Sequence, residues 1–219
     1  MVKVPLYRTI FGYKIGRRVR IGLSWILVDR LEIGDAVRIG HFNRFKDIPD
    51  VRLGDHCTIG HSNIFTGSIE FNHPDSLRDR GNSPRLVLGR HCSVTMRHYF
   101  DVSDACEVGA FTVVAGVSSV LFTHFLDVAT SEQRTRPIHI GDYCMLGAAV
   151  RIAPGARIPD CCVVGMGAVV TKTFSESYAL LAGSPATVIK TLPRDGAYFA
   201  RTRGWIGRYA APAASDNAR

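Results

Sequence analysis

Large aliphatic or aromatic residues recur at every sixth position over most of this chain of 219 residues. The spacing is clearest between residues 140 and 172, where a small residue or a threonine follows each apolar one. A helix needs apolar residues three and four apart and an ordinary strand needs alternation, so a sustained period of six matches neither. It predicts a repeat architecture in which each hexad forms a short strand and a tight turn. The apolar positions of the pattern are Ile15, Ile21, Leu27, Ile33, Ile39, Phe45, Val51, Leu53, Ile59, Phe65, Phe71, Leu88, Val94, Phe100, Val102, Val108, Val114, Val120, Ile140, Leu146, Ile152, Ile158, Val164 and Val170.

Two polar segments interrupt the pattern, at residues 72–85 and 121–137. Loops of this length in a compact domain are commonly functional, although the first could equally be a tolerated insertion. Rigid scaffolds concentrate function in such loops.

The repeat defines one long domain, residues 15–190. Residues 1–14 are predicted to form an N-terminal cap, which the open end of a solenoid needs. Apolar residues at partly helical spacing predict a short C-terminal helix over residues 191–210, and residues 211–219 a disordered tail.

The six cysteines invite a metal or disulfide interpretation, but their positions oppose it. Five of them fall four residues after an apolar position, a slot that valine and alanine also occupy: Cys57, Cys92, Cys106, Cys144 and Cys162. We expect them to point inward as small hydrophobic residues. Cys161 adjoins Cys162, and adjacent cysteines seldom form a disulfide. Reduced thiols and the lack of an apolar leader segment predict a cytoplasmic protein.

Residues 15–190 resemble the hexapeptide-repeat acyltransferases, closest to the sugar and polysaccharide O-acetyltransferase type, and the resemblance is sharpest over residues 137–190. The residues that carry the resemblance are Pro137-Ile138-His139-Ile140-Gly141-Asp142, Thr171-Lys172 and Gly183-Ser184-Pro185-Ala186-Thr187-Val188-Ile189-Lys190. The resemblance implies an all-β left-handed parallel β-helix, a triangular prism with three hexads per coil. It also implies a homotrimer with active sites between neighbouring prisms, and acetyl-CoA as the acyl donor.

Acyl transfer from a thioester needs a general base, donors for the oxyanion and a groove for the thioester. His124 is the predicted base, because it stands at the start of the second loop, shortly before the Pro-Ile-x-Ile-Gly-Asp segment, as in the family. A carboxylate that fixes its tautomer would help. The candidates for that carboxylate are Asp101, Asp127 and Glu132.

The segment Arg97-His98-Tyr99-Phe100-Asp101 resembles a polar cluster found before the catalytic coil in some polysaccharide-modifying members. His98 and Tyr99 are therefore expected to contact the acceptor, a small molecule or a glycan.

The family resemblance also places the donor. Thr171 and Lys172 are expected at the nucleotide end of CoA, with Lys190 as a second basic contact. Ala148 and Met166 are expected to line the pantetheine groove.

Composition leaves other partners open. The net charge of +8 favours an anionic ligand, an acidic glycan or a weak association with a membrane surface, but it does not choose among them. We predict no nucleic-acid partner.

Three alternatives to an O-acetyltransferase remain. One is an N-acyltransferase or an enzyme that takes its acyl group from acyl-carrier protein. A second is a metalloenzyme similar to the γ-class carbonic anhydrases, built on His41, His56 and His61, although no metal is expected. The third is a noncatalytic scaffold.

Overall fold

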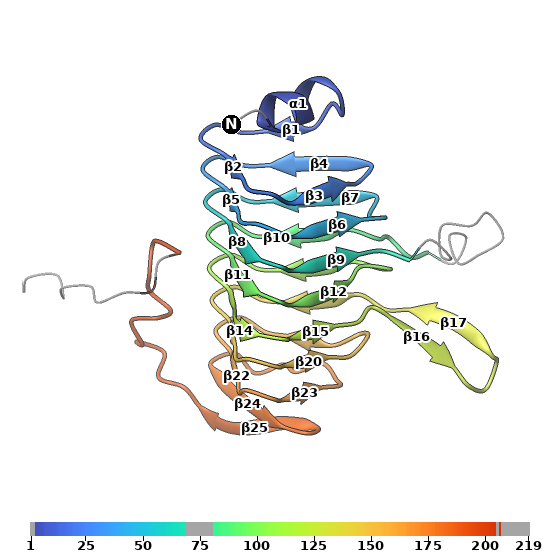
Figure 1. Ribbon diagram of the computed structural model, residues 1–219. Helices are drawn as coiled ribbons and strands as arrows, with labels where there is room; N and C mark the ends of the chain where they lie inside the picture. The colour runs from blue at the N-terminus through green and yellow to red at the C-terminus, as the bar shows by residue number, and fades with distance from the viewer. Residues whose placement is uncertain (1–2, 69–80, 205, 207–219) are drawn as a thin grey trace, which may run out of the picture.

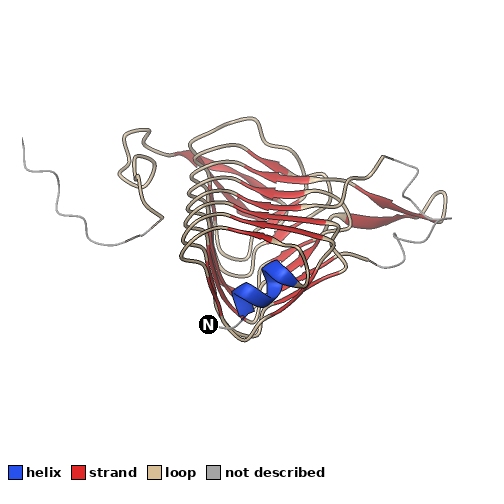
Figure 2. Ribbon diagram, turned by 90° about the horizontal axis from the view of Figure 1, so that it is seen from above, coloured by secondary structure: helices blue, strands red, loops and turns tan. Residues whose placement is uncertain are grey.

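The computed structural model describes residues 3–68, 81–204 and 206 of the chain, and these form a triangular prism with a parallel β-sheet on each side (Figures 1 and 2). The first sheet contains β1 (Lys14–Ile15), β4 (Arg30–Ile33), β7 (Asp50–Leu53), β10 (Leu86–Leu88), β13 (Cys106–Val108), β18 (Ile138–Ile140) and β21 (Arg157–Ile158). The second contains β2 (Arg20–Ile21), β5 (Arg38–Ile39), β8 (Thr58–His61), β11 (Ser93–Met96), β14 (Val113–Val117), β19 (Met145–Leu146), β22 (Val163–Val164), β24 (Ala179–Gly183) and β25 (Ala186–Thr191), of which β25 runs antiparallel. The third contains β3 (Trp25–Leu27), β6 (Arg44–Lys46), β9 (Ile64–Thr66), β12 (Tyr99–Asp101), β15 (Val120–Leu121), β20 (Arg151–Ile152) and β23 (Val169–Val170).

The chain visits the three sheets in turn, so strands that pair within a sheet lie one coil apart in sequence. Arg20 pairs with Arg38 and Met145 with Val163, each 18 residues on, as three hexads require. We call the edge between the first and second sheets the first corner, that between the second and third sheets the second corner, and that between the third and first sheets the third corner.

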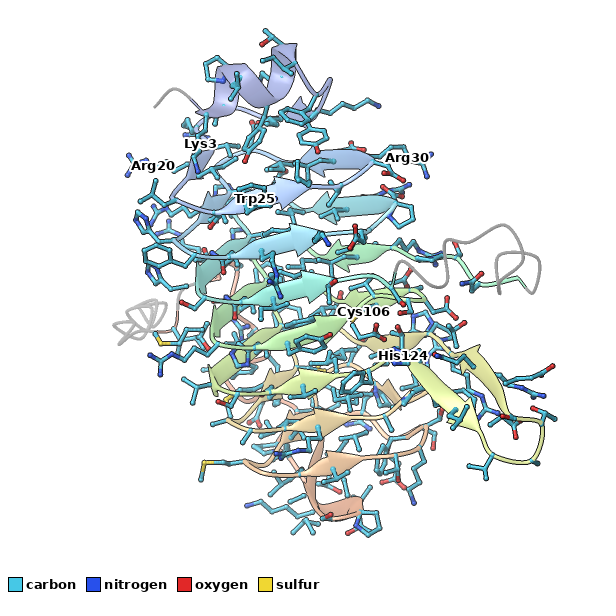
Figure 3. All side chains as sticks on the ribbon, turned by 45° about the vertical axis from the view of Figure 1, so that its right-hand side comes forward. Lys3, Arg20, Trp25, Arg30, Cys106 and His124 are labelled. Atoms are coloured by element: carbon cyan, nitrogen blue, oxygen red, sulfur yellow. The ribbon has the colours of Figure 1, made fainter. Side chains whose placement is uncertain are left out.

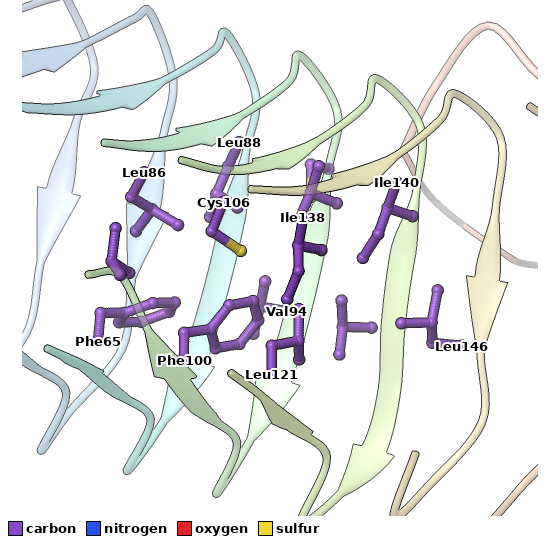
Figure 4. Packing of buried hydrophobic residues seen from close by; sticks show 14 of the residues in the cluster. Phe65, Leu86, Leu88, Val94, Phe100, Cys106, Leu121, Ile138, Ile140 and Leu146 are labelled. Atoms are coloured by element: carbon purple, nitrogen blue, oxygen red, sulfur yellow. The ribbon is translucent and has the colours of Figure 1, made fainter. Parts of the chain in front are cut away.

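The inward side chains fill the prism with one continuous core (Figure 4). The rings of Phe45, Phe65 and Phe100 stack along the axis with centroids 4.4 and 4.8 Å apart. All six cysteines are buried and free, which agrees with the inward positions predicted for five of them. Burial of large side chains at about 1.5 to 3 kcal/mol each is the main stabilising contribution.

Two positions of the sequence pattern are wrong by one residue. Leu27 and Val120 are exposed or partly exposed, whereas their neighbours Ile26 and Leu121 are buried. Turns of unequal length explain the slip. Ile21 and Ile26 are five residues apart, whereas Val114 and Leu121 are seven apart and β14 contains a β-bulge. A count of sixes cannot detect a shorter or longer turn when the following strands return to phase.

The two ends of the prism differ. The helix α1 (Lys3–Thr9) covers the N-terminal end, where Tyr7 joins the core. The predicted C-terminal helix is wrong where it can be judged, because residues 192–204 contain turns and no helix. Gly196 and Gly204 disfavour a helix there. Residues 207–219, with the predicted tail, lie outside the described residues.

The structure describes only one of the two segments that interrupt the repeat in full. Most of the segment 72–85 lies outside the described residues. The segment 121–137 contains an antiparallel hairpin of β16 (His124–Asp127) and β17 (Glu132–Thr135), which projects from the prism (Figure 1). No helix among the described residues is long and apolar enough to cross a membrane.

Candidate active site

The hairpin leaves the prism at the third corner, after β15 and before β18. Its base is closed where the Arg136 N–H donates to the Thr123 carbonyl oxygen at 2.8 Å. His124 is the first residue of β16 and lies at this base, where the hairpin meets the rigid coil (Figure 3). Its imidazole is therefore held by the prism while one side faces solvent.

His124 and Asp101 form a close pair at this corner. The Nδ1 atom of His124 lies 2.9 Å from Oδ2 of Asp101, and the His124 side chain is 32% exposed against 3% for the carboxylate. Asp101 ends β12, and β12 pairs with β15 in the third sheet. The coil that precedes the hairpin thus supplies the carboxylate, 23 residues before the histidine.

Hydrogen bonds hold the Asp101 carboxylate in one orientation. Oδ2 accepts hydrogen bonds from the Thr123 N–H and hydroxyl, both at 2.8 Å, and from the His124 N–H at 3.1 Å. Oδ1 accepts one from the Ser103 hydroxyl at 2.6 Å. Burial raises the pKa of Asp101, but the bonds from His124, Ser103 and Thr123 outweigh it, so the pKa lies below its usual value. Asp101 is an anion at neutral pH.

Aromatic residues continue the site along the third sheet. The ring of Phe122 meets that of His124 edge-on, with centroids 5.5 Å apart. The ring centroids of Tyr99 and Phe122 are 5.6 Å apart. Tyr99 therefore stands on the same surface as the dyad, but separated from His124 by Phe122. A partly exposed aromatic surface beside a base can receive the apolar face of a sugar ring.

Two of the candidate carboxylates for His124 are directed elsewhere. Successive side chains of a strand point to opposite faces, so Asp127, three residues after His124 in β16, points away from it. Its Oδ2 lies 3.2 Å from Nε of Arg134, across the hairpin. Glu132 pairs with Asp127 in register at the far end of the hairpin, and its Oε2 lies 3.4 Å from Nη2 of Arg134. The sequence-based placement of Asp127 beside the base is therefore wrong.

The prediction that His98 contacts the acceptor is also wrong, because the residue is only 1% exposed. Its Nδ1 accepts a hydrogen bond from the Ser119 N–H at 3.1 Å, and its Nε2 lies 2.9 Å from the Thr95 hydroxyl oxygen. Desolvation lowers the pKa of His98 to about 4, so it is neutral at neutral pH. His98 belongs to a buried polar column at the second corner.

That column joins five coils through Ser24, Asn43, Asn63, His98 and Ser119. The Asn43 amide donates to Ser24 at 3.1 Å, the Asn63 amide donates to Asn43 at 3.0 Å, and the His98 N–H donates to Asn63 at 3.0 Å. Each buried polar side chain thus has a partner in the next coil.

The residues predicted to bind CoA lie at three places within one chain. Thr171 and Lys172 follow β23 at the third corner, two strand spacings, or roughly 10 Å, along the axis from the base of the hairpin. Ala148 and Met166 lie in adjacent coils at the second corner, and the Met166 side chain is 79% exposed. Lys190 is on β25. Thr171 and Lys172 share the corner of His124, whereas the others do not.

The outward histidines separate into two pairs. His41 and His61 stack at the second corner with ring centroids 5.5 Å apart, whereas His56 stacks on His91 at the first corner, 4.7 Å apart. Among the described residues, no three histidine, cysteine or acidic side chains gather as a metal site would require. His41, His56 and His61 are therefore not brought together within the chain.

Sequence reasoning missed Thr123, Ser103 and Phe122. Thr123 and Ser103 are buried and complete the Asp101 site, and Phe122 supports the His124 ring. Thr123 and Phe122 directly precede His124, which was a signal available in the sequence. Ser103 had no such signal.

No protein-family model matches the chain. It is 27% identical over 159 residues to a chloramphenicol acetyltransferase of Morganella morganii, an alignment that covers 65% of this chain and 68% of the relative. Among solved structures it resembles a hexapeptide-repeat-containing acetyltransferase from Vibrio cholerae, with a TM-score of 0.52 and 20% identity over 64% of this chain and 73% of that one. It also resembles AntD, an N-acyltransferase from Bacillus cereus in complex with dTDP-4-amino-4,6-dideoxyglucose and Coenzyme A, with a TM-score of 0.55 and 15% identity over 89% of this chain and 91% of that one.

These comparisons confirm the fold and the resemblance. The fold is the left-handed parallel β-helix that the resemblance implies. The relative is an acetyltransferase and the structural neighbours are acyltransferases, as the resemblance to the hexapeptide-repeat family predicts.

Proposed function

We propose that this protein, which resembles the hexapeptide-repeat acetyltransferases in sequence and fold, is an O-acetyltransferase. It moves an acetyl group from acetyl-CoA to a hydroxyl of a saccharide or of a nucleotide- or lipid-linked sugar. One observation carries the proposal: the buried, ionised Asp101 lies 2.9 Å from Nδ1 of a half-exposed histidine at the base of a projecting hairpin. A histidine held this way by a carboxylate is the arrangement of a general base.

In the proposed mechanism a proton passes from the acceptor hydroxyl to His124 and then to the CoA sulfur. With Nδ1 directed at Asp101, Nε2 of His124 accepts the proton of the acceptor hydroxyl. The hydroxyl oxygen attacks the thioester carbonyl, and backbone N–H groups of the coil stabilise the oxyanion. When the tetrahedral intermediate collapses, the carbon–sulfur bond breaks and the CoA sulfur leaves with the proton from His124. No acyl-enzyme forms.

The donor site follows the third corner. Thr171 and Lys172 are exposed below the hairpin, and the Lys172 ammonium lies 5.3 Å from the centre of the Phe174 ring, so it is held near this corner. A lysine there can contact a CoA phosphate as a point charge. Ala148, Met166 and Lys190 lie elsewhere on the chain, and in a homotrimer a neighbouring subunit would bring its own copies to the site.

The acceptor and the cell compartment are proposed on broader grounds. The partly exposed Phe122 beside His124, and Tyr99 next to Phe122, favour a sugar ring over a chain without an apolar face. Six free, buried thiols are consistent with a reducing cytoplasm.

Calorimetric titration with acetyl-CoA tests the donor first. We expect one ligand per chain in the wild type and at least about tenfold weaker binding in Lys172→Ala/Lys190→Ala, since each lysine would lose a charged phosphate contact. Lys14→Ala is the matched control, because Lys14 is exposed and lies in β1 at the N-terminal end of the prism. This variant should bind acetyl-CoA as the wild type does. Absence of binding by the wild type would reject CoA and direct the search to acyl-carrier protein.

An assay of acetyl transfer to a panel of acceptors tests the reaction, with the rate measured from the appearance of the free CoA thiol. The panel contains free and nucleotide-linked sugars, amino sugars, and chloramphenicol, which the relative's name suggests. His124→Ala should lose roughly a hundredfold or more in rate. Transfer only to amines would replace the O-acetyltransferase with an N-acyltransferase, and activity unchanged in His124→Ala would refute the proposed base.

A further inference from the structure

The positive charge of the protein is concentrated at one end. Residues 1–46 contain ten lysine or arginine residues and three acidic ones, a net charge of +7 out of +8 for the whole chain. Some of this charge is neutralised locally, as where Arg17 lies 3.1 Å from Asp35. Arg20, Arg38 and Arg44 form no ion pair with any described residue, and all three are exposed or nearly so.

The same end exposes large apolar side chains. Seven of the sixteen such side chains in the described part of the chain lie before residue 43: Leu6, Ile10, Phe11, Leu23, Trp25, Leu27 and Phe42. Trp25 is 63% and Phe42 71% exposed, values that a packed core residue would not show. An exposed apolar cluster with a basic rim is typical of an interaction surface.

On the third sheet, the apolar and basic residues occupy successive levels along the prism axis. Beyond the first coil, Leu6 in α1 and Ile10 just after it are exposed, and the first coil exposes Trp25 and Leu27 on the third sheet. In the next coil the register places Arg44 beside Trp25 and Lys46 beside Leu27. Adjacent strands are about 4.8 Å apart, so the basic level lies about 5 Å behind the apolar one.

The second corner and the second sheet of these two coils each add a pair of like residues. Phe42 donates its N–H to the Leu23 carbonyl oxygen, so both apolar side chains lie at the second corner of adjacent coils. On the second sheet Arg20 pairs in register with Arg38. Figure 3 shows Lys3, Arg20, Trp25 and Arg30 gathered at this end, away from His124. We call Arg20, Leu23, Trp25, Leu27, Arg38, Phe42, Arg44 and Lys46 the N-terminal patch.

We infer that the N-terminal patch, together with the exposed side of α1, docks the prism end-on against an anionic lipid bilayer. In this orientation the apolar level enters the boundary between head groups and acyl chains, which amphipathic elements reach to about 5 to 10 Å. Trp25 lies at the interface, where tryptophan is enriched. Arg38, Arg44 and Lys46 then stand at the depth of the lipid phosphates.

Two other occupants match these features less well. A second copy of the chain docking end to end would bring together two surfaces of net charge +7, which repel each other. A soluble acidic polysaccharide would satisfy the basic residues, but it would leave Leu23, Leu27 and Ile10 exposed to water. A bilayer accommodates both levels.

Sedimentation with vesicles tests the inference. We expect the wild type to pellet with vesicles of phosphatidylcholine and phosphatidylglycerol but not with phosphatidylcholine alone, and to be released by high salt. Trp25→Ser/Phe42→Ser and Arg38→Glu/Arg44→Glu should each lower the vesicle partition coefficient by at least about tenfold. All four side chains are exposed, so these variants should fold.

Matched controls come from the same rows outside the patch. The control variants are Arg151→Glu and Met96→Ser. Arg151 lies in the same outward row of the third sheet as Arg44, and Met96 is an exposed apolar side chain at the second corner. Both should bind vesicles as the wild type does. In a Trp205→Phe background, Trp25 is the remaining tryptophan, and brominated lipid should quench its fluorescence only in anionic vesicles.

Several results would overturn the inference. One is equal pelleting with neutral and anionic vesicles, or vesicle binding by the patch variants that matches the wild type. Another is a fall in molar mass by light scattering in the patch variants, which would assign the surface to contacts between copies. Binding to a soluble acidic polysaccharide through the same residues, without quenching of Trp25 by lipid, would assign it to a glycan.

Discussion

Asp101 and His124 concentrate the proposed chemistry in two side chains, and the structure makes their relation testable. In the proposed mechanism Asp101 orients His124 and, being ionised, stabilises the imidazolium that would form during transfer. Asp101→Asn keeps the shape but offers no negative charge. We expect the rate of acetyl transfer to fall by roughly a hundredfold or more, with a smaller change in KM. The pH dependence of the rate should change as well, because the variant lacks the anion beside the base.

Asp127→Asn is the matched control for this prediction, because Asp127 is also an aspartate close in sequence to His124 but contacts Arg134 instead. It should stay within about threefold of the wild type, as a partly exposed ion pair contributes little. Equal losses in the two variants would contradict the assignment of Asp101 as the orienting carboxylate.

The sequence could select His124 as the candidate base but could not select its partner. His124 was predictable because it precedes a recognisable segment at the start of a loop. Asp101 was one of three candidates, since its position beside His124 depends on how β12 and β15 align after an irregular coil. The family resemblance suggested candidate site residues along the chain, but neither it nor the hexads could show that His98 turns inward and Asp101 toward the hairpin.

At the scale of elements, the C-terminal segment is the main departure from the sequence-based expectation. After β25 the chain runs back along the first corner (Figure 1), where the Tyr198 hydroxyl donates to the Cys144 carbonyl oxygen at 2.9 Å and the Gly204 N–H donates to Nδ1 of His91 at 3.2 Å. Its aromatic residues resembled one face of a helix in sequence. In the fold Tyr198 packs on the guanidinium of Arg201, which also lies over Phe111 and Tyr143, whose stacked rings have centroids 4.7 Å apart.

Arg201 secures this segment and allows a stability prediction. It is 7% exposed, its guanidinium carbon lies 3.8 Å from the centre of the Tyr198 ring, and it donates hydrogen bonds to the carbonyl oxygens of Phe111 and Tyr198. Arg201→Gln loses the cation–π contact and leaves buried acceptors unsatisfied. We expect about 1 to 3 kcal/mol of lost stability in urea denaturation.

Arg203 provides the control, since it lies in the same segment and is exposed. Arg203→Gln should unfold within about 0.5 kcal/mol of the wild type. If both variants unfold at the same urea concentration as the wild type, the segment does not contribute to the stability of the prism.

At the scale of the whole molecule, the buried polar column at the second corner makes the stability of the prism depend on pH, because His98 belongs to it. The unfolded chain protonates His98 near its ordinary pKa of 6.5, whereas the folded protein keeps it neutral down to about 4. Stability is therefore complete above pH 6.5 and falls between pH 6.5 and 4, after which the loss levels off. By pH 5 this residue alone should cost about 2 kcal/mol relative to neutral pH.

Urea denaturation of the wild type and His98→Gln at pH 7 and pH 5 measures the contribution of His98 to this loss of stability. Glutamine does not titrate, so the loss between the two pH values should be smaller in the variant by about 2 kcal/mol. Other titrating groups, including His91, contribute equally to both proteins and cancel in the difference. An identical loss in the two proteins would show that His98 does not titrate as inferred.

The coils of the prism add length at a constant rise, so the number of coils sets how far the reaction centre stands from the N-terminal end. From β3 to β15 there are four strand spacings in the third sheet, or roughly 20 Å. If that end rests on a bilayer, the prism acts as a ruler. An acceptor anchored in the lipid must then present its hydroxyl roughly 20 Å above the head groups, a reach that suits a sugar several units along a glycan. Deleting one coil before β12 would move the dyad about 5 Å closer and shift acetylation toward sugars nearer the anchor.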